Sequence, residues 1–297
     1  MSGFEVLQEA TWSNIEDLGR YGYNHVGVSN SGAMDEYAYR WSQKLLGNKE
    51  SNAIEVMLGG LKLKATADVE ISVCGADLDF RINQEKKVMW QTYQIRKNDV
   101  LGFYGQINGL RAYLSVKEGF KVQKKYNSYS RTYKEQKLKK GDFIPFTPSK
   151  SRDIKHVSIP YIPTYSDTLT LHILLGSQEH FFSQSTKEIF FNTNYTLTPH
   201  MSPMGYKLQG KVLVTKKGGI ISEGIPFGTV QIPPDGQPII LLKERQTIGG
   251  YPKIGTVLAS DCFALAQLPI GANVQFKEIS ITDAQNKMKA FYGIFLK

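Results

Sequence analysis

The apolar residues of this chain come in many short runs that are interrupted by Gly, Asn, Asp or Pro. The clearest runs are residues 61–63, 69–73, 111–116, 169–175 and 238–242. Runs of this length, bounded by turn-forming residues, are typical of β-strands. Three further segments repeat a turn followed by apolar residues, and these are 97–101, 140–144 and 270–274. The sequence therefore predicts a mainly β fold, organised as a barrel or a sandwich.

Helices are expected to be few and short. Four side chains recur at the spacing of one helix face and are followed by Gly47-Asn48, which would end the helix: Met34, Ala38, Trp41 and Leu45. Residues 177–187 and 260–268 each begin with a serine that can cap a helix N-terminus. Thr282 and Gln285 fit a capping box, which predicts a terminal helix over residues 282–297.

The length of 297 residues fits two domains of ordinary size. Four of the twelve prolines fall between residues 145 and 165, in a stretch with little periodicity. We therefore expect a junction in this stretch. The predicted division is an N-terminal β subdomain over residues 1–152, a C-terminal β subdomain over 153–281, and the terminal helix over 282–297.

Composition excludes several classes of protein. Hydrophobic residues make up 41% and charged residues 21%, which is typical of a folded globular chain. The longest aliphatic run, residues 239–242, is far shorter than the ~20 residues that span a bilayer, and the N-terminus has no apolar leader. Two cysteines, Cys74 and Cys262, provide no disulfide framework. We expect a cytoplasmic protein without membrane insertion, in which both thiols are buried and reduced.

The common metal and cofactor motifs are missing from the sequence. Gly249-Gly250 belongs to no dinucleotide-binding or phosphate-binding glycine pattern, and neither a nucleophile elbow nor a protein-kinase motif set is present. The five histidines have no metal-ligand spacing with the two cysteines. We therefore expect no metal site and no cofactor bound through a recognisable motif.

Much of the formal charge of +9 lies in residues 117–140, where nine Lys or Arg residues face two Glu. Three tyrosines are interleaved with these charges, and they are Tyr126, Tyr129 and Tyr133. Cations and aromatic rings in this mixture can line a groove for single-stranded nucleic acid. No nucleic-acid-binding motif accompanies the stretch, and we favour a solvated loop.

A first candidate site is rich in glycine and charge and covers residues 17–28 and 31–35. Ser31-Gly32 immediately precedes the predicted helix, so its backbone N–H groups could face a carboxylate or phosphate. The alternative interpretation is structural. In that case Asp35 complements the helix dipole, and Asp17 pairs with Arg20.

A second candidate site covers residues 224–255. The turn formed by residues 233–236 is a sufficient explanation of Asp235. Gln246, Tyr251 and Lys253 surround Gly249-Gly250, which can fold the chain tightly. An amide, a phenol and an ammonium could then converge on one polar ligand, such as a carboxylate or a ureido group.

At these segments the chain resembles a known family, the biotin-dependent carboxyltransferase-like proteins. The matching pieces are DLGRYGYNHVGV (17–28), SGAMD (31–35), LLGN (45–48), AIEVMLGG (53–60), CGADL (74–78) and the long run ISEGIPFGTVQIPPDGQPIILLKERQTIGGYPKIGTVLASD (221–261). The similarity extends from Val6 to Phe276. The resemblance implies cyclophilin-like β-barrels in two subdomains, so that the C-terminal subdomain would be such a barrel, and a KipI-like partner subunit.

Members of this family support different reactions. In 5-oxoprolinase, to which the family contributes the C subunit, the complex couples ATP hydrolysis to opening of the lactam of 5-oxoproline. The resemblance thus implies a subunit of an ATP-dependent 5-oxoprolinase-type hydrolase, which acts with KipI-like and LamB-like partners. One alternative is a non-catalytic regulatory protein like KipA. Another is a carboxyltransferase-type subunit for urea-like or allophanate-like amides, and only there would biotin enter, carried by another protein.

The matching motifs also carry over candidate site residues. The resemblance implies three catalytic residues, Asp35, Asp235 and Lys253, and five substrate-binding residues, Arg20, Ser31, Gln231, Gln246 and Tyr251. Lys253 and Arg20 would bind an anion. Asp35 or Asp235 would handle a proton or recognise an amide, and Gln246 with Tyr251 would orient the substrate.

Two segments depart from the family pattern. Relatives carry a glycine-rich stretch that ends in Gly-Arg, where this chain has the glycine-free residues 130–138. The usual Ser-Asp-Arg-Met-Gly is replaced here by Met-Ser-Pro-Met-Gly at residues 201–205. If the missing Arg and Asp bind substrate, a carboxylate or anion loses a bidentate partner, at a cost of about 1 to 3 kcal/mol.

Overall fold

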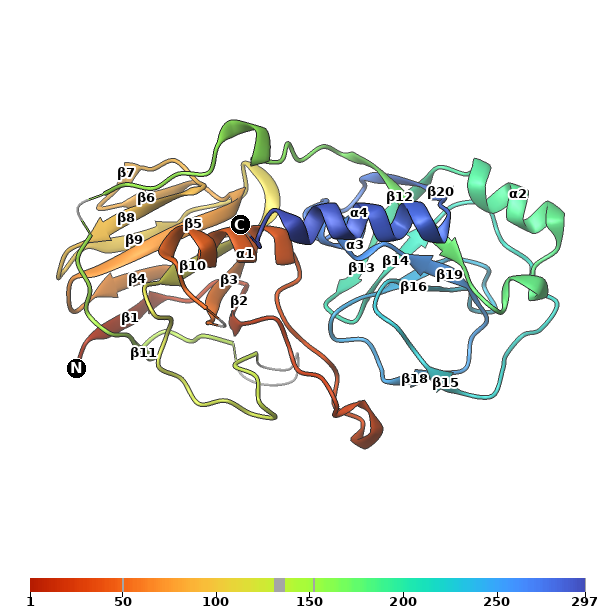
Figure 1. The fold of residues 1–297 in the computed structure, drawn as a ribbon, viewed down its shortest axis with the longest axis horizontal. Helices are drawn as coiled ribbons and strands as arrows, with labels where there is room; N and C mark the ends of the chain where they lie inside the picture. Colours follow the sequence, from red (N-terminus) through yellow and green to blue (C-terminus); the bar gives the residue numbers. More distant parts are fainter. Residues whose placement is uncertain (50, 131–136, 152, 297) are drawn as a thin grey trace. The chain divides into compact units, whose positions relative to one another are not determined.

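A computed structural model describes residues 1–49, 51–130, 137–151 and 153–296, which form two compact units (Figure 1). The first unit contains Met1–Arg20 and Ser31–Tyr165, and the second contains Tyr21–Asn30 and Ser166–Lys297. The proline-rich stretch 145–165 thus groups with the first unit. The chain passes between the units three times, and we call the early crossing segment, residues 21–30, the arm.

In the residues that the structure describes, the first unit contains two antiparallel sheets and one α-helix. The six-stranded sheet has the order β11 (Phe143–Pro145), β1 (Gly3–Gln8), β4 (Lys62–Ala65), β9 (Val100–Phe103), β6 (Phe80–Ile82) and β7 (Glu85–Lys86). The five-stranded sheet has the order β2 (Trp12–Glu16), β3 (Ala53–Met57), β10 (Asn108–Val116), β5 (Val69–Asp77) and β8 (Gln91–Ile95). The central strands β5 and β10 are buried along almost their whole length, so the core lies against them.

Helix α1 (Glu36–Leu46) packs on β5 and β10. Asp35 caps its first turn, because the carboxylate accepts a hydrogen bond from the Ala38 N–H. Gly47 ends it at a φ of 63°, a conformation that glycine adopts without strain. The sequence prediction of this helix, including its end at Gly47, is confirmed.

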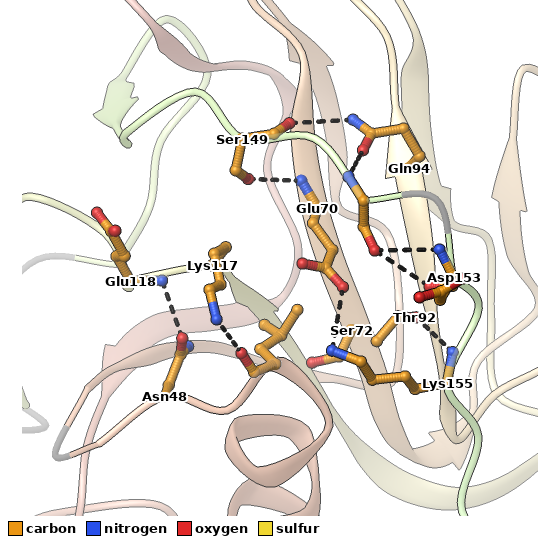
Figure 2. A network of polar contacts seen from close by, with 12 residues as sticks. Asn48, Glu70, Ser72, Thr92, Gln94, Lys117, Glu118, Ser149, Asp153 and Lys155 are labelled. Carbon is orange, nitrogen blue, oxygen red and sulfur yellow. Dashed lines mark hydrogen bonds and ion pairs between the residues drawn. The ribbon is translucent and has the colours of Figure 1, made fainter.

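A strap formed by residues 149–151 and 153–157 covers the edge strand β8 (Figure 2). Gln94 donates to the Ser149 carbonyl at 3.2 Å and accepts from the Ser151 N–H at 2.7 Å. Thr92 and Lys155 exchange two hydrogen bonds of 2.8 and 2.9 Å. Main-chain and side-chain groups of β8 thus bind this strap, which covers the sheet edge.

The second unit is built around a closed barrel of seven strands. In barrel order these are β12 (Thr168–Leu175), β19 (Lys253–Val257), β16 (Thr229–Gln231), β17 (Ile239–Leu241), β14 (Gly205–Gln209), β13 (Tyr195–Ser202) and β20 (Asn273–Glu278). Strands β12 and β20 close the barrel as a parallel pair. A short ribbon of β15 (Glu223–Gly224) and β18 (Ile248–Gly249) lies outside the barrel order.

Three helices accompany the barrel: α2 (Gln184–Asn192), α3 (Ala259–Leu265) and α4 (Ile281–Gly293). All three occur near their predicted positions, but the predicted caps are wrong. Ser183 caps α2, because a 3-10 turn at Glu179–Phe181 occupies the first part of the predicted range. Leu258 precedes α3 without a side-chain cap, and Ser280 rather than Thr282 caps α4.

The predicted mainly β fold with few helices is confirmed. Each of the eight segments predicted to contain a strand overlaps one. The second unit is a closed barrel, whereas the described strands of the first unit form two separate sheets. Both cysteines are buried free thiols, and burial raises the pKa of each. No helix within the described residues is both long enough and apolar enough to cross a membrane.

Candidate functional site

A cavity of about 320 Å³ lies on the outer surface of the barrel, where β13, β14, β16 and β17 meet the loop after β17. We call it the glutamine cavity, and its polar lining comes from His200, Ser202, Lys207, Gln231, Gln246 and Tyr251. The strand register places Lys207, Ile239 and Gln231 in one row across β14, β17 and β16. The alternate row, Tyr206, Ile240 and Val230, is fully buried and faces the barrel interior.

Gln231 is the most buried polar residue of this lining, with only 1% of its surface exposed. Its Nε2 atom has no hydrogen-bond partner within the described part of the chain. Gly249 is packed against this amide, because a Cβ there would lie 2.9 Å from Gln231 Nε2 and 3.4 Å from Gln246 Nε2. The two carboxamides are therefore neighbours, and Gly249 provides the space for both. A buried donor without a partner is unfavourable unless a ligand carries the acceptor.

The rim of the cavity is formed by more exposed groups. Tyr251 is 42% exposed, and Ser202 and Met204 come from the tip of the β13–β14 hairpin. These two residues belong to segment 201–205, which departs from the family pattern. The structure therefore brings together the predicted Gln231, Gln246 and Tyr251, and it places one of the two divergent segments beside them.

Asp235 lies outside the lining and contacts Lys207, which belongs to it. The two side chains form an ion pair, which holds the pKa of the Asp235 carboxyl below its usual range. Asp235 also accepts from the Gln237 N–H at 3.1 Å, as expected of a residue in a tight turn. The positive charge of Lys207 is thus compensated at the edge of the cavity. A catalytic role for Asp235 stays a prediction.

Lys253 lines a second, smaller cavity of about 190 Å³, which we call the lysine pocket. It pairs with Glu223, and its backbone N–H donates to Gln178 at 3.0 Å. Gln178 in turn donates to Glu223 at 2.6 Å. The β16–β19 ladder sets Lys253 directly opposite Gln231, so the two cavities are adjacent. The Glu223 side chain is half exposed, whereas that of Lys253 is 11% exposed.

The other three predicted residues belong to the first unit. Arg20 is 2% exposed and donates to the carbonyl of Ser130. Ser31 is buried at a φ of 56°, and Asp35 caps the N-terminus of α1. Roles for these residues in binding a substrate stay predictions.

Asp17 organises a buried polar cluster in the first unit. Its carboxylate accepts from the Gly19 N–H at 2.7 Å, from the Ser128 and Ser130 hydroxyls at 2.6 and 2.7 Å, and from the Tyr129 N–H at 2.7 Å. It fixes residues 128–130, where the second divergent segment begins. The greater part of that segment, residues 131–136, lies outside the described residues.

The basic stretch uses some of its aromatic rings internally. Lys124 lies 4.8 Å from the ring centre of Tyr129, and Lys125 lies 5.9 Å from that of Tyr126. Tyr133 falls outside the described residues. Nucleic-acid binding by residues 117–140 stays an untested alternative.

Sequence reasoning missed several residues beside the predicted ones, and these are His200, Ser202, Lys207, Gln178 and Glu223. The sequence pattern bears on His200 only as a potential metal ligand, and within the described residues no group of three metal-ligating side chains occurs. The available signal was the strand period of two, which places Lys207 on the same face as Gln231 once the strand order is known.

Comparison with known proteins gives a consistent result. The family described as carboxyltransferase domain, subdomain A and B, matches residues 26–278. The C subunit of 5-oxoprolinase from Haemophilus influenzae is 34% identical over 94% of this chain and 92% of that protein, and that of Escherichia coli is 28% identical with the same coverage. A putative urea carboxylase of Emericella nidulans is 23% identical over 98% of this chain but only 26% of its own length.

Among solved structures, the urea amidolyase of K. lactis superposes with a TM-score of 0.92 at 24% identity. The match covers 99% of this chain and 20% of that protein. This likeness establishes the fold.

Proposed function

The chain belongs to the family of carboxyltransferase domains with subdomains A and B, and from this membership we propose that it is a subunit of an ATP-dependent 5-oxoprolinase complex. The observation that carries the proposal is similarity over the full length. Relatives named as the C subunit of 5-oxoprolinase are covered to 92%, whereas the urea carboxylases and urea amidolyases are covered to 29% at most.

The chemistry of the two cavities supports this function. The substrate 5-oxoproline carries a lactam amide and a carboxylate. Gln231 and Gln246 offer carboxamides that can bond the lactam, and Gln231 has a buried donor ready for its carbonyl oxygen. The neighbouring Lys253 can exchange Glu223 for the substrate carboxylate. Hydrolysis adds water across the C–N bond and gives glutamate, while ATP is hydrolysed in the same cycle.

Other subunits complete the reaction in this proposal. The sequence carries no phosphate-binding loop, so we assign ATP binding to a partner. The partners are the KipI-like subunit and the LamB-like subunit implied by the sequence resemblance. This chain would then contribute substrate recognition, with hydrolase activity belonging to the complex.

Two alternatives make different predictions. A regulatory protein like KipA would bind its partners without turnover. A carboxyltransferase-type subunit would act on a urea-like amide and would need carboxybiotin supplied by another protein. The structural superposition on urea amidolyase shows a shared fold and does not distinguish between these functions.

The deciding experiment measures ATP-dependent release of glutamate from 5-oxoproline. This chain is mixed with the KipI-like and LamB-like subunits of the same source, and each component is omitted in turn. Activity that disappears without this chain supports the proposal. Partner binding without glutamate formation, in a mixture where urea carboxylation is assayed in parallel, contradicts it and favours one of the alternatives.

Replacing Lys253 by methionine is expected to lower kcat/KM for 5-oxoproline by about 10- to 100-fold, since a charge-assisted hydrogen bond contributes ~1.5–3 kcal/mol. Most of the loss should appear in KM, because the ammonium binds a carboxylate that does not react. The matched control is Lys277→Met on β20, where the side chain is exposed. Unchanged kinetics of Lys253→Met would remove Lys253 from the site.

A further inference from the structure

The arm is a largely exposed loop in which no residue is buried. Its middle is a 3-10 turn over Asn24–Val26, which ends at Gly27 with a φ of 78°. Tyr21 and Val26 are 71% and 60% exposed. A Cβ added at Gly22 or Gly27 would meet open space. The side chains of its last two residues, Ser29 and Asn30, form hydrogen bonds with the rest of the second unit.

Ser29 and Asn30 make these links. The Ser29 hydroxyl donates to a carboxylate oxygen of Glu244 at 2.7 Å. Arg245 donates from Nη2 to the side-chain oxygen of Asn30 at 2.9 Å. Arg245 is 8% exposed, so each acceptor of its guanidinium replaces water that the group has lost.

Arg245 also holds the backbone behind the glutamine cavity. Its Nε donates to the Ile225 carbonyl at 2.8 Å, and its Nη1 donates to the Leu242 carbonyl at 3.2 Å. Ile225 lies next to the β15–β18 ribbon and packs against Gly249, where its Cδ1 would be 2.6 Å from an added Cβ. One guanidinium thus ties the arm, the end of β17 and the ribbon together.

Glu244 makes a further contact beside the glutamine cavity. Its N–H donates to the Pro203 carbonyl at 2.8 Å, at the hairpin tip that contributes to the cavity rim. The next residue after Arg245 is Gln246, which lines the cavity beside Gln231. The two residues that the arm holds therefore lie directly before a cavity residue in the chain.

We propose that Ser29 and Asn30 are positioning residues for the glutamine cavity, which hold Glu244 and Arg245 so that Gln246 faces Gln231. The kinetic consequence rests on the proposed function, whereas the structural consequence does not. Without Asn30 the buried guanidinium loses an acceptor, and the backbone of residues 244–246 gains freedom. A displacement of about 1 Å in such a site can reduce the rate ~100-fold.

The test compares Ser29→Ala, Asn30→Ala and the double variant with Ser29→Thr and Asn30→Asp. The last two variants keep the hydroxyl donor and the acceptor oxygen. Amide hydrogen exchange is measured on the whole protein, and kinetics with 5-oxoproline are measured in the reconstituted complex. We expect at least about 10-fold faster exchange in residues 244–251 and a loss of kcat/KM on the order of 10- to 100-fold, mainly in kcat. Threonine and aspartate should restore both.

The matched control is His25→Ala, because His25 is exposed in the 3-10 turn of the same arm and takes no part in either link. It should behave like the wild type. Unchanged exchange in residues 244–251 of the double variant overturns the proposal. Faster exchange throughout the barrel also overturns it, since the arm would then be a general stabiliser. If exchange is faster only in residues 244–251 of the double variant, and the reconstituted wild-type complex makes no glutamate, the positioning role is supported. Only the proposed function is then contradicted.

Discussion

Replacing Gln231 by methionine is expected to change stability and activity in opposite directions. The side chain keeps its length but loses a buried amide that has no partner in the described residues. An unsatisfied buried donor costs about 1–3 kcal/mol, so the free energy of unfolding should stay level or rise by up to that amount. Turnover of 5-oxoproline by the complex should fall on the order of 100-fold, because a substrate carbonyl loses its donor.

Calorimetric unfolding of the isolated chain and glutamate release by the complex measure the two effects. Gln275→Met on β20 is the matched control, since that side chain is exposed, and both quantities should match the wild type there. A loss of stability of more than about 1 kcal/mol in Gln231→Met would contradict the interpretation, because the amide would then be a structural anchor. Residues that are unfavourable for stability and required for activity are typical of binding sites.

The largest effect on stability is expected for Asp17→Ala. The Asp17 carboxylate accepts four hydrogen bonds, and three of them join it to residues 128–130. Because the cluster is buried, its donors would lose a charged acceptor without gaining water. We expect a loss of about 3–5 kcal/mol from the first unit.

Tryptophan fluorescence during urea unfolding isolates this effect. The three tryptophans of the chain, Trp12, Trp41 and Trp90, all belong to the first unit. Asp153→Ala is the matched control, since Asp153 is exposed and its contacts to Ser151 are made by its backbone. It should shift the unfolding free energy by no more than ~0.5 kcal/mol. Equal midpoints for the two variants would show that the Asp17 cluster does not stabilise the unit.

Local pattern was sufficient for helix α1 and for eight of the strands. The end of α1 at Gly47 and a strand at residues 69–73, the first part of β5, follow from spacing and turn residues alone. Helix caps were less predictable, because two serines six residues apart, Ser177 and Ser183, fit the same pattern. The 3-10 turn after Ser177 leaves Ser183 as the helix cap. The stability of that turn depends on packing against residues that lie outside a short stretch of sequence.

The site was predictable only in part, for a related reason. Gln246 and Tyr251 flank a Gly-Gly pair in sequence, so their proximity could be expected. Gln231, by contrast, entered the prediction only through the resemblance. Lys207 reaches the same cavity through strand pairing, and pairing between β14, β17 and β16 depends on the register of strands that are far apart in sequence. Asp235 fits its turn, but its partner Lys207 was not foreseeable for the same reason.

The hydrogen bonds of Ser29 and Asn30 affect the order in which parts of the protein can fold during synthesis. Ser29 and Asn30 each lie 215 residues before the side chain that holds them. At a synthesis rate of ~5–20 residues per second, Glu244 and Arg245 are synthesised on the order of ten seconds or more after Ser29 and Asn30. The first unit can fold in that time with the arm hanging from it. If residues 1–165 and 166–297 were expressed separately, the arm would be part of the first fragment. The barrel fragment would then lack the hydrogen bonds of Ser29 and Asn30 to Glu244 and Arg245.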